Sequence, residues 1–490
     1  MARRLGLALA AALILTQAFI GPDGVPPTTP SVDAQSDDTS VAGRKDLRAQ
    51  VNASAAAATD RVLVAFKSDV RPADQAAAHT KAGGTRVGQM GRVSVDVARV
   101  PQGSVQSALA KYRNDPNVLY AEPDFIGNGA DDAVLTRQAV ASGVSSSLTR
   151  AWSSNDPLGS SQWNLDKISV PSAWAKSKGS SSVKIAILDT GIDLDHEDLK
   201  GRVVATANFT STATTTGSPC MQSTVSANDV HGHGTHVAGI AAASFNNGLG
   251  ISGVAGQSSL MVAKVLDDKN TGYYSWWICG ITWAVDNGAK VINLSLGGTA
   301  SSEALRAAVD YAWSKGVVVV AAAGNQSSTS PFYPAYYTNA IAVGSTTSTD
   351  GLASTTNRGT WVDVSAPGVD ILSTLPNHTN VMGKLNYGTQ TGTSMASPHV
   401  AGIAALLWSS GASSASVVRS TIQSSADRIS GTGTYFYYGR VNAAKALGVT
   451  APVATPTPTS KPIPTATPNT TSSGRGGNGA ALSPSTRPRR

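Results

Sequence analysis

Cysteine, charge and long apolar runs are all scarce in this 490-residue sequence. The two cysteines, Cys220 and Cys279, allow one disulfide bond at most, and both a pair and two separate thiols are open alternatives. Charged residues make up only 14% of the chain, which is low for a cytosolic protein, so uncharged polar residues must keep the surface soluble. Hydrophobic residues make up 41%, enough for a large core, yet no segment after the first twenty residues could span a bilayer.

The formal net charge of +7 is concentrated at the C-terminus. Residues 451–490 contain five Lys and Arg residues and no acidic residue, so the rest of the chain is nearly neutral. The basic balance therefore belongs to a Pro- and Thr-rich tail, which we expect to be a disordered spacer. It does not indicate a nucleic-acid-binding face, and we expect no nucleic-acid partner.

The N-terminus has the pattern of a secretory signal. Two arginines precede an uncharged apolar run from Leu5 to Ile20, which is short for a membrane span of about 20 residues. No clear cleavage site of small residues follows, so an uncleaved anchor is the alternative. We expect a signal peptide over residues 1–34 and a secreted, extracellular protein without a stable membrane span, whose tail is a potential contact to the cell envelope.

Composition and periodicity divide the remaining chain into five segments. We expect a disordered connector over 35–59, a small α+β domain over 60–126, a linker over 127–152, a large domain over 153–449 and the tail over 450–490. In the small domain, strand-like alternation at 61–67, 92–100 and 118–125 is separated by helical spacing at 73–82 and 104–115.

The large domain has the pattern of a parallel α/β sheet. Continuous Val, Ile and Ala runs at 183–189, 260–267, 290–298, 317–325 and 340–345 alternate with helical segments. Such runs suit strands that are buried on both faces. Ligands of these sheets gather at the carboxyl ends of the strands, which here are polar or rich in glycine.

Residues suited to nucleophilic catalysis stand at the ends of two of these runs and at the starts of two helical segments. Asp189 ends a strand, and His233 and Ser394 each begin a helical segment. A serine hydroxyl needs an imidazole to accept its proton, and the imidazole needs a carboxylate to orient it. Asn325 could supply a side-chain donor to an oxyanion, beside the amide of Ser394. Ser394 lies in GTSMA, so the G-x-S-x-G motif of α/β-hydrolases is excluded.

Four segments resemble the Asp, His, Asn and Ser motifs of the subtilases, the subtilisin-like serine endopeptidases: ILDTGIDLDHEDL, HGHGTHVAG, AAAGN and GTSMASPHVAG. The resemblance covers nearly all of 155–447 and is closest to the thermitase-like branch. It implies a subtilisin-like three-layer α/β fold, with a central mostly parallel sheet and helices on both faces. It also implies a monomeric serine endopeptidase of broad specificity that cleaves proteins or peptides through an acyl-enzyme, with Asp189, His233, Ser394 and Asn325 as its catalytic residues.

The same resemblance implies the substrate-binding segments. A substrate would lie as an added strand between Asn270, Thr271, Gly272 on one side and Ser295, Leu296, Gly297 on the other. Ala322, Ala323 and Gly324 would form the wall of the pocket for the side chain before the scissile bond. Relatives in this family often have a small or polar residue at the depth of the pocket where this chain has Phe332. If Phe332 points into the pocket, large aromatic substrate side chains would fit poorly.

A single structural Ca²⁺ site and no organic cofactor are also implied. Its ligands would be Asp156, Asp198 and Asn247, with carbonyls near Leu249 and Ile251, because hard oxygen ligands suit Ca²⁺. The second, Asp-rich calcium loop of thermitase-like enzymes is not matched, since Asp229 is the only acid in 209–229; Cys220 would staple that loop instead.

The small domain resembles a subtilase propeptide with a ferredoxin-like α+β fold, which implies a self-processing precursor inhibited by its own propeptide. Two alternatives remain at this point. One is a catalytically inactive subtilase fold used for binding, and the other is a zinc hydrolase that uses His231, His233 and His236. We favour one catalytic imidazole, His233, and interpret the glycines beside it as room for a substrate backbone.

Overall fold

The computed structural model describes residues 55–130, 154–210 and 219–449. The expected signal peptide, most of the connector, most of the linker and the tail therefore lie outside the described residues. Two expected boundaries fall inside them. A strand already begins at Ala57, within the expected connector, and another continues to Gly129, past the expected end of the small domain at residue 126.

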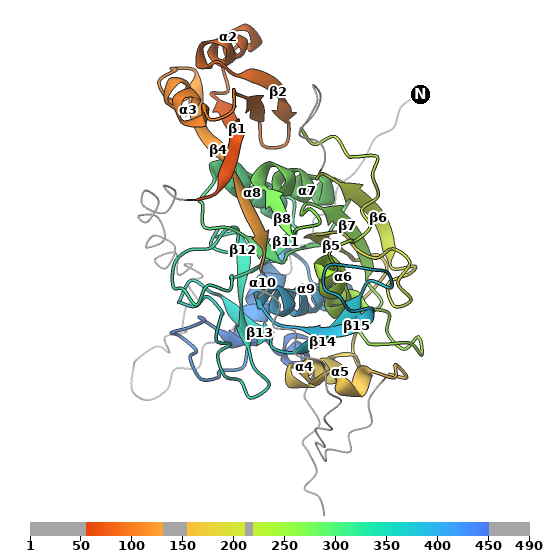
Figure 1. The fold of residues 1–490 in the computed structure, drawn as a ribbon. Helices are drawn as coiled ribbons and strands as arrows, with labels where there is room; N and C mark the ends of the chain where they lie inside the picture. Colours follow the sequence, from red (N-terminus) through yellow and green to blue (C-terminus); the bar gives the residue numbers. More distant parts are fainter. Residues whose placement is uncertain (1–54, 131–153, 211–218, 450–490) are drawn as a thin grey trace, which may run out of the picture. The chain divides into compact units, whose positions relative to one another are not determined.

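The small domain is an antiparallel sheet with two helices on one face (Figure 1). Its elements are β1 (Ala57–Phe66), α2 (Pro72–Ala82), β2 (Thr85–Met90), β3 (Val95–Arg99), α3 (Val105–Arg113) and β4 (Val118–Gly129), with strand order β4-β1-β3-β2. Val62 and Val64 pack with the helices, whereas Leu63 and Ala65 join a second cluster of buried residues. The expected α+β pattern is present. The structure adds one strand that the sequence did not predict, β2, because its residues TRVGQM include few apolar side chains.

The large domain is built on a sheet of eight strands in which every pair is parallel. In spatial order they are β16 (Gly439–Arg440), β13 (Val364–Pro367), β12 (Ala340–Thr346), β11 (Val318–Ala322), β9 (Val291–Leu294), β5 (Lys184–Asp189), β7 (Ser259–Lys264) and β6 (Val203–Asn208). The expected parallel sheet is confirmed.

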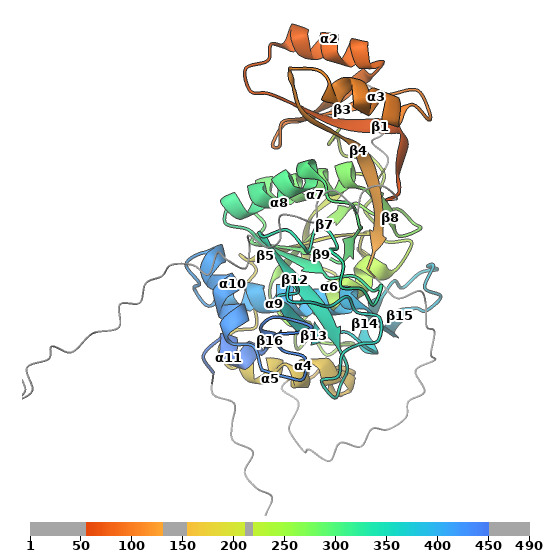
Figure 2. The same ribbon diagram turned by 90° about the vertical axis from the view of Figure 1, so that its left-hand side faces the viewer.

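Helices cover both faces of this sheet and make three layers (Figures 1 and 2). On one face lie α6 (His233–Ala242), α9 (Thr393–Ser409) and α10 (Ala415–Ser424), and on the other α7 (Tyr274–Asp286) and α8 (Glu303–Ser314). Side chains of a strand alternate between the two cores. Ile185 and Ile187 of β5 pack with α6 and α9, whereas Ala186 and Leu188 pack with α7 and α8. The predicted three-layer α/β fold is therefore confirmed.

Shorter elements complete the large domain. They are a 3₁₀ turn (Gly159–Ser161), α4 (Trp163–Lys167), α5 (Val170–Ala173), β8 (Thr271–Tyr273), β10 (Leu296–Gly297), β14 (Ile371–Leu375), β15 (Asn386–Gln390) and α11 (Ala443–Ala446). β14 and β15 form an antiparallel hairpin beside α6.

Strand β4 joins the two domains, because it pairs antiparallel with β8 on one side and with β10 on the other. Two buried carboxylates of the same strand reach the first turns of the outer helices. Glu122 accepts hydrogen bonds from the Ser302 hydroxyl (2.6 Å) and the Glu303 amide (2.9 Å) at the start of α8. Asp124 accepts from the Ser275 amide (3.0 Å) and hydroxyl (2.7 Å) in the first turn of α7. Carboxylates at helix N-termini satisfy free amides and complement the helix dipole.

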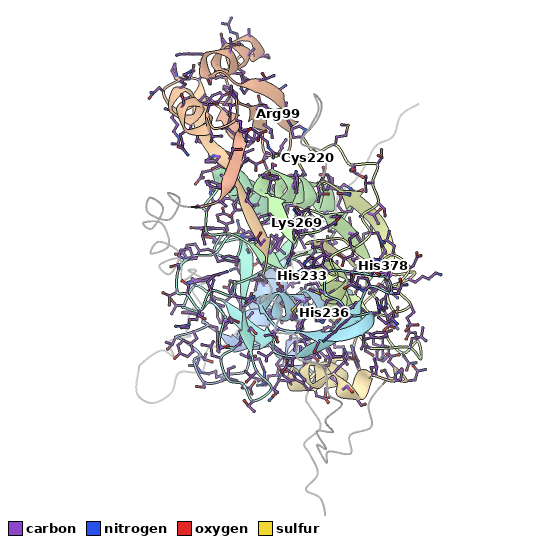
Figure 3. The ribbon with its side chains drawn as sticks, in the orientation of Figure 1. Arg99, Cys220, His233, His236, Lys269 and His378 are labelled. Carbon is purple, nitrogen blue, oxygen red and sulfur yellow. A yellow bond between two sulfur atoms is a disulfide. The ribbon has the colours of Figure 1, made fainter. Side chains whose placement is uncertain are left out.

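The two cysteines form a disulfide bond between Cys220 and Cys279, 59 residues apart in sequence. Cys279 is buried on α7, and Cys220 precedes the segment that leads to Asp229 and α6; Figure 3 labels Cys220. The alternative left open by the sequence is thereby resolved in favour of the pair.

Replacing Cys220 and Cys279 together by Ser should lower the free energy of unfolding by about 2–4 kcal/mol, because the disulfide limits the conformations of the unfolded chain. Denaturant unfolding is measured in a Ser394→Ala background, so that proteolysis does not interfere. A reducing agent should shift the disulfide-bonded protein to the curve of the double variant and leave that variant unchanged. Coincident curves for all samples would contradict the prediction.

Candidate active site

Asp189 and His233 meet at the carboxyl edge of the parallel sheet. Asp189 is the last residue of β5 and His233 the first of α6, and both side chains are buried. The imidazole Nδ1 lies 2.6 Å from Asp189 Oδ1, which also accepts the Thr190 amide at 2.7 Å. Because a carboxylate only accepts, Nδ1 carries the proton and Nε2 is the basic nitrogen of neutral His233.

Gly234, the second residue of α6, allows this helix to come close to the end of β5. A Cβ added to Gly234 would lie 2.0 Å from the Gly191 carbonyl oxygen and 3.1 Å from Asp189 Cβ. Any larger residue would push α6 away from the end of β5, and His233 with it. The interpretation of this glycine as room for a substrate backbone is therefore wrong: it makes room for the strand that carries Asp189.

Asp229 organises the turn before His233, a role that the sequence motifs did not reveal. Its buried carboxylate accepts the amides of His231 (3.1 Å), Gly232 (2.8 Å) and Thr235 (2.9 Å). It also accepts the hydroxyls of Thr190 and Thr235. An Asp three residues before a Gly at the start of a helical segment, DVHG at 229–232, is the sequence signal that could have identified it.

Ser394 and Asn325 converge on one carbonyl oxygen, that of Ala130. Ser394 is the second residue of α9, and its amide donates to Ala130 O at 3.0 Å. Asn325 Nδ2 donates to the same oxygen at 2.6 Å, while its Oδ1 accepts the Thr393 amide at 3.0 Å. Free amides at a helix N-terminus bind negative charge, so this pair of donors can stabilise an oxyanion. The Ser394 hydroxyl donates to the Ser295 carbonyl at 3.1 Å.

The three clustered histidines have separate surroundings. His236 is fully buried, its Nε2 lies 3.1 Å from the Gly388 carbonyl, and burial lowers its pKa to about 3, so it stays neutral. His231 is buried, with its ring centroid 6.4 Å from that of His233. Figure 3 labels His233 and His236. Within the described ranges no three His, Cys, Asp or Glu side chains are grouped as metal ligands. The zinc alternative thus lacks a converging ligand set.

The segments expected to bind substrate flank the end of β4. The Gly129 amide donates to the Asn270 carbonyl (3.0 Å), and the Ala130 amide donates to the Ser295 carbonyl (2.9 Å). In the strand register, Thr271 and Gly272 of β8 face Asn128 and Gly127, and Leu296 and Gly297 of β10 face Gly129 and Asn128. Ala322 is the last residue of β11, Ala323 and Gly324 follow it before Asn325, and both alanines are fully buried.

The expected calcium ligands form a connected group. Buried Asp156 accepts the amides of Asn246 and Asn247, each at 2.9 Å. Buried Asp198 accepts from Asn247 Nδ2 (2.8 Å) and from the Ile251 amide (2.9 Å). The Leu249 amide donates to Asn247 Oδ1 at 3.0 Å.

The charge of this group is unbalanced. In the part of the chain that the structure describes, no ion pair involves Asp156 or Asp198, although both carboxylates are buried. Burial raises the pKa of Asp198. Two buried carboxylates beside the amide oxygen of Asn247 are oxygen donors of the kind that fits a hard divalent cation.

Known proteins resemble both domains. The Peptidase_S8 model, for the Subtilase family, matches residues 180–448, and a model of the fervidolysin N-terminal prodomain matches residues 44–124. The thermophilic serine proteinase of Bacillus sp. (strain AK1) is 41% identical over 387 residues, 79% of this chain and 86% of that protein. Thermitase of Thermoactinomyces vulgaris is 50% identical over 294 residues, 60% of this chain and 98% of that protein.

A solved structure is similar over most of the chain. Fervidolysin from Fervidobacterium pennivorans, a keratinolytic enzyme related to subtilisin, superposes with a TM-score of 0.67 at 27% sequence identity. The superposition covers 81% of this chain and 62% of that one. Because the matched region includes both domains, the likeness extends beyond the residues around Ser394.

Replacing Asn325 by Ala should lower kcat for peptide hydrolysis about 10²–10³-fold with little change in KM, because one of the two oxyanion donors is lost. Steady-state kinetics on a soluble peptide measure both parameters. Asn287→Ala, which removes an exposed amide at the end of α7, is the control and should leave kcat unchanged. If kcat of the Asn325→Ala variant stays within about threefold of the wild-type kcat, Asn325 is not an oxyanion donor.

Proposed function

Because the chain belongs to the subtilase family of serine endopeptidases, we propose that it is a secreted precursor that cleaves its own Ala130–Asp131 bond and then hydrolyses other proteins. The observation that carries this proposal is the Ala130 carbonyl, held by the Ser394 amide and Asn325 Nδ2. The proposed boundary lies four residues beyond the domain end expected from the sequence. The alternative, an inactive binding protein, leaves this arrangement of donors without a use.

In the proposed mechanism His233 acts as the base. Rotation of the Ser394 side chain away from the Ser295 carbonyl brings its hydroxyl to His233 Nε2, and Asp189 stabilises the imidazolium that forms. Ser394 Oγ bonds to the Ala130 carbonyl carbon, and the oxygen takes up negative charge between its two donors. Protonated His233 then gives its proton to the Asp131 nitrogen as the C–N bond breaks, leaving an acyl-enzyme that water hydrolyses with His233 again as base.

After cleavage the propeptide would remain as an inhibitor. β4 occupies the substrate strand between β8 and β10, so no second peptide can pair there until it leaves. The carboxylates of Glu122 and Asp124 at the helix ends hold it further.

Purified wild-type protein should begin with Asp131 on N-terminal sequencing, and Ser394→Ala should remain an uncleaved precursor without activity on casein, because it lacks the nucleophile. Ser409→Ala, on the same helix, is the matched control and should process normally. Normal processing of pure Ser394→Ala would overturn the proposed function. A mature N-terminus other than Asp131 would overturn the position of the cut but not the activity.

We further propose one structural Ca²⁺ bound by Asp156, Asp198 and the Asn247 side chain, with carbonyls of the 249–251 segment completing the shell. Bound there, the ion would neutralise two buried carboxylates and tie the 246–251 loop to Asp156, which precedes α4. It takes no part in the steps at Ser394.

Adding Ca²⁺ to chelator-treated Ser394→Ala protein should raise its thermal midpoint, since an ion at 100 times its Kd stabilises by about 2.7 kcal/mol. Asp156→Asn should lose most of this response, because it removes one buried negative charge. Asp195→Asn, an exposed acid in the same region as Asp198, should retain it. Equal responses of both variants would contradict the proposed ligand set.

Secretion rests on the N-terminal sequence pattern, which lies outside the described residues. Within those residues, no helix has the length and apolar character needed to cross a membrane. A monomer of broad specificity without an organic cofactor remains the expectation from the family resemblance.

A further inference from the structure

The end of β4 shows which side chains the substrate groove accepts. The residues before the proposed cut are counted here as acyl-side positions: Ala130 is the first, Gly129 the second, Asn128 the third and Gly127 the fourth. Two of these four residues are glycine and one is alanine. The neighbours of each position explain why.

At the first position, Phe332 occupies the pocket. A Cβ on Gly297 would lie 2.2 Å from Phe332 Cε1, and a Cβ on Gly324 would lie 2.9 Å from Phe332 Cδ1. The ring edge therefore lies against Gly324 of the expected pocket wall and against Gly297 of the segment expected to pair with the substrate, and only 4% of Phe332 is exposed. The Ala130 side chain is buried in the same hydrophobic cluster as Phe332. The Phe332 ring therefore reduces the space left beside the expected pocket wall for any side chain longer than methyl.

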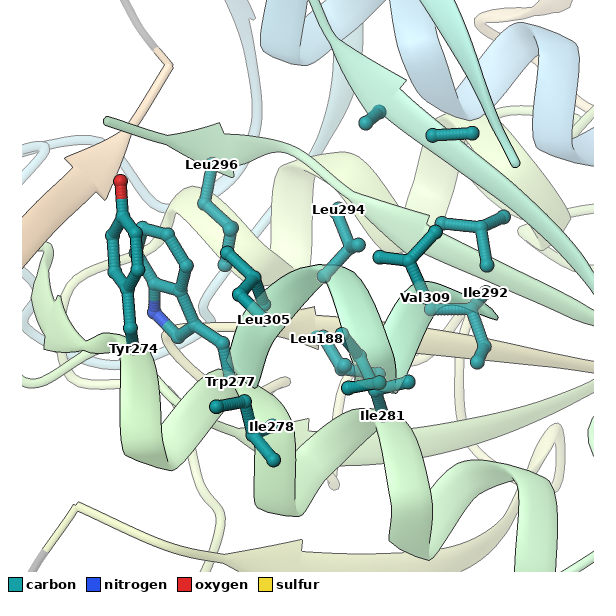
Figure 4. Packing of buried hydrophobic residues seen from close by; sticks show 14 of the residues in the cluster. Leu188, Tyr274, Trp277, Ile278, Ile281, Ile292, Leu294, Leu296, Leu305 and Val309 are labelled. Carbon is teal, nitrogen blue, oxygen red and sulfur yellow. The ribbon is translucent and has the colours of Figure 1, made fainter. Parts of the chain in front are cut away.

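At the fourth position, Trp277 limits the size of the residue that fits. A Cβ on Gly127 would lie 2.4 Å from Trp277 Cη2 and 2.4 Å from the Gly297 carbonyl oxygen. Trp277 has no exposed surface and is stacked on Tyr274, with centroids 4.6 Å apart. Figure 4 shows the two rings side by side on α7, near Leu296. A packed ring and a backbone oxygen cannot yield easily, so a side chain here forces the strand to move.

The second position is less strict. A Cβ on Gly129 would lie 2.3 Å from Asn270 Oδ1 and 2.4 Å from Nδ2. These atoms belong to a side chain, whereas the fourth position meets a packed ring and a backbone oxygen, so the second position is the less restricted of the two. Selection is therefore expected to come mainly from the first and fourth positions.

The geometry points to an enzyme that is selective for extended segments rich in glycine and alanine, with Phe332 and Trp277 as its specificity-determining residues. It should require a small residue, Ala or Gly, at the first acyl-side position and Gly at the fourth. This inference rests on the proposed function. It replaces the expected broad specificity with a narrow one on the acyl side of the bond.

The test uses the self-processed enzyme and three peptides with one common leaving group: Gly-Asn-Gly-Ala, Gly-Asn-Gly-Phe and Phe-Asn-Gly-Ala. Wild type should prefer Ala to Phe at the first position, and Gly to Phe at the fourth, by about 100-fold in kcat/KM, within the range that pocket contacts provide. Phe332→Ala should reduce the first ratio about tenfold or more and leave the second unchanged. Trp277→Ala should lower the second ratio, by a smaller factor because the Gly297 carbonyl oxygen stays in place, and should leave the first ratio unchanged.

Ratios within one enzyme do not depend on the active fraction, so partial misfolding does not alter the result. Phe332→Leu and Trp277→Ile replace either alanine variant that fails to accumulate, and should shift the same ratios in the same direction. Phe209→Ala, which removes an equally buried ring packed near Trp283, is the control and should change neither ratio.

Similar kcat/KM values of wild type for all three peptides would overturn the inference and leave the proposed function intact. If neither Phe332→Ala nor Trp277→Ala changes its ratio, Phe332 and Trp277 are not the specificity-determining residues. Absence of hydrolysis of every peptide and of casein, together with absence of labelling by a serine-directed fluorophosphonate, would instead overturn the proposed function.

Discussion

The pairing of β4 with β8 and β10 is the interaction on which the rest of the site depends. Two edge segments of the large domain hydrogen-bond one strand, and its register is fixed because Gly129 meets Asn270 and Ala130 meets Ser295. A shift of one residue would turn every side chain to the opposite face of the strand and would move another carbonyl to the donors of Ser394 and Asn325. The register of β4 between β8 and β10 therefore also decides which peptide carbonyl reaches the donors of Ser394 and Asn325.

Close backbone packing prepares the chemistry before any substrate arrives. The sheet places Asp189 at its carboxyl edge, Gly234 lets α6 approach that edge, and Asp229 fixes the turn in between. None of these contacts touches a substrate. They hold the His233 imidazole in one orientation, so that little reorganisation would be needed in the proposed proton transfer from Ser394.

Much of this could be predicted from sequence, because its signals are local. The continuous apolar runs indicated β5, β7, β9, β11 and β12, and the motifs around Asp189, His233, Asn325 and Ser394 placed them at strand or helix ends. The remainder depends on distant contacts. β2, β13 and β16 have weak patterns of their own, and nothing near Ala130 in the sequence reveals that its carbonyl meets α9. The Cys220–Cys279 pair likewise depends on where α7 packs.

The buried carboxyl groups of β4, Glu122 and Asp124, make the binding of the propeptide to the large domain depend on pH. Burial raises the pKa of Glu122 to about 7 from an ordinary 4.5, and it raises the pKa of Asp124 as well. When β4 leaves the groove, Glu122 returns to water and to an ordinary pKa, so its departure would release a proton between about pH 4.5 and 7, and the raised pKa of Asp124 acts in the same direction. Propeptide removal is then favoured as the pH rises through that interval. By this linkage the large domain would hold the propeptide more tightly at acidic pH than at neutral pH.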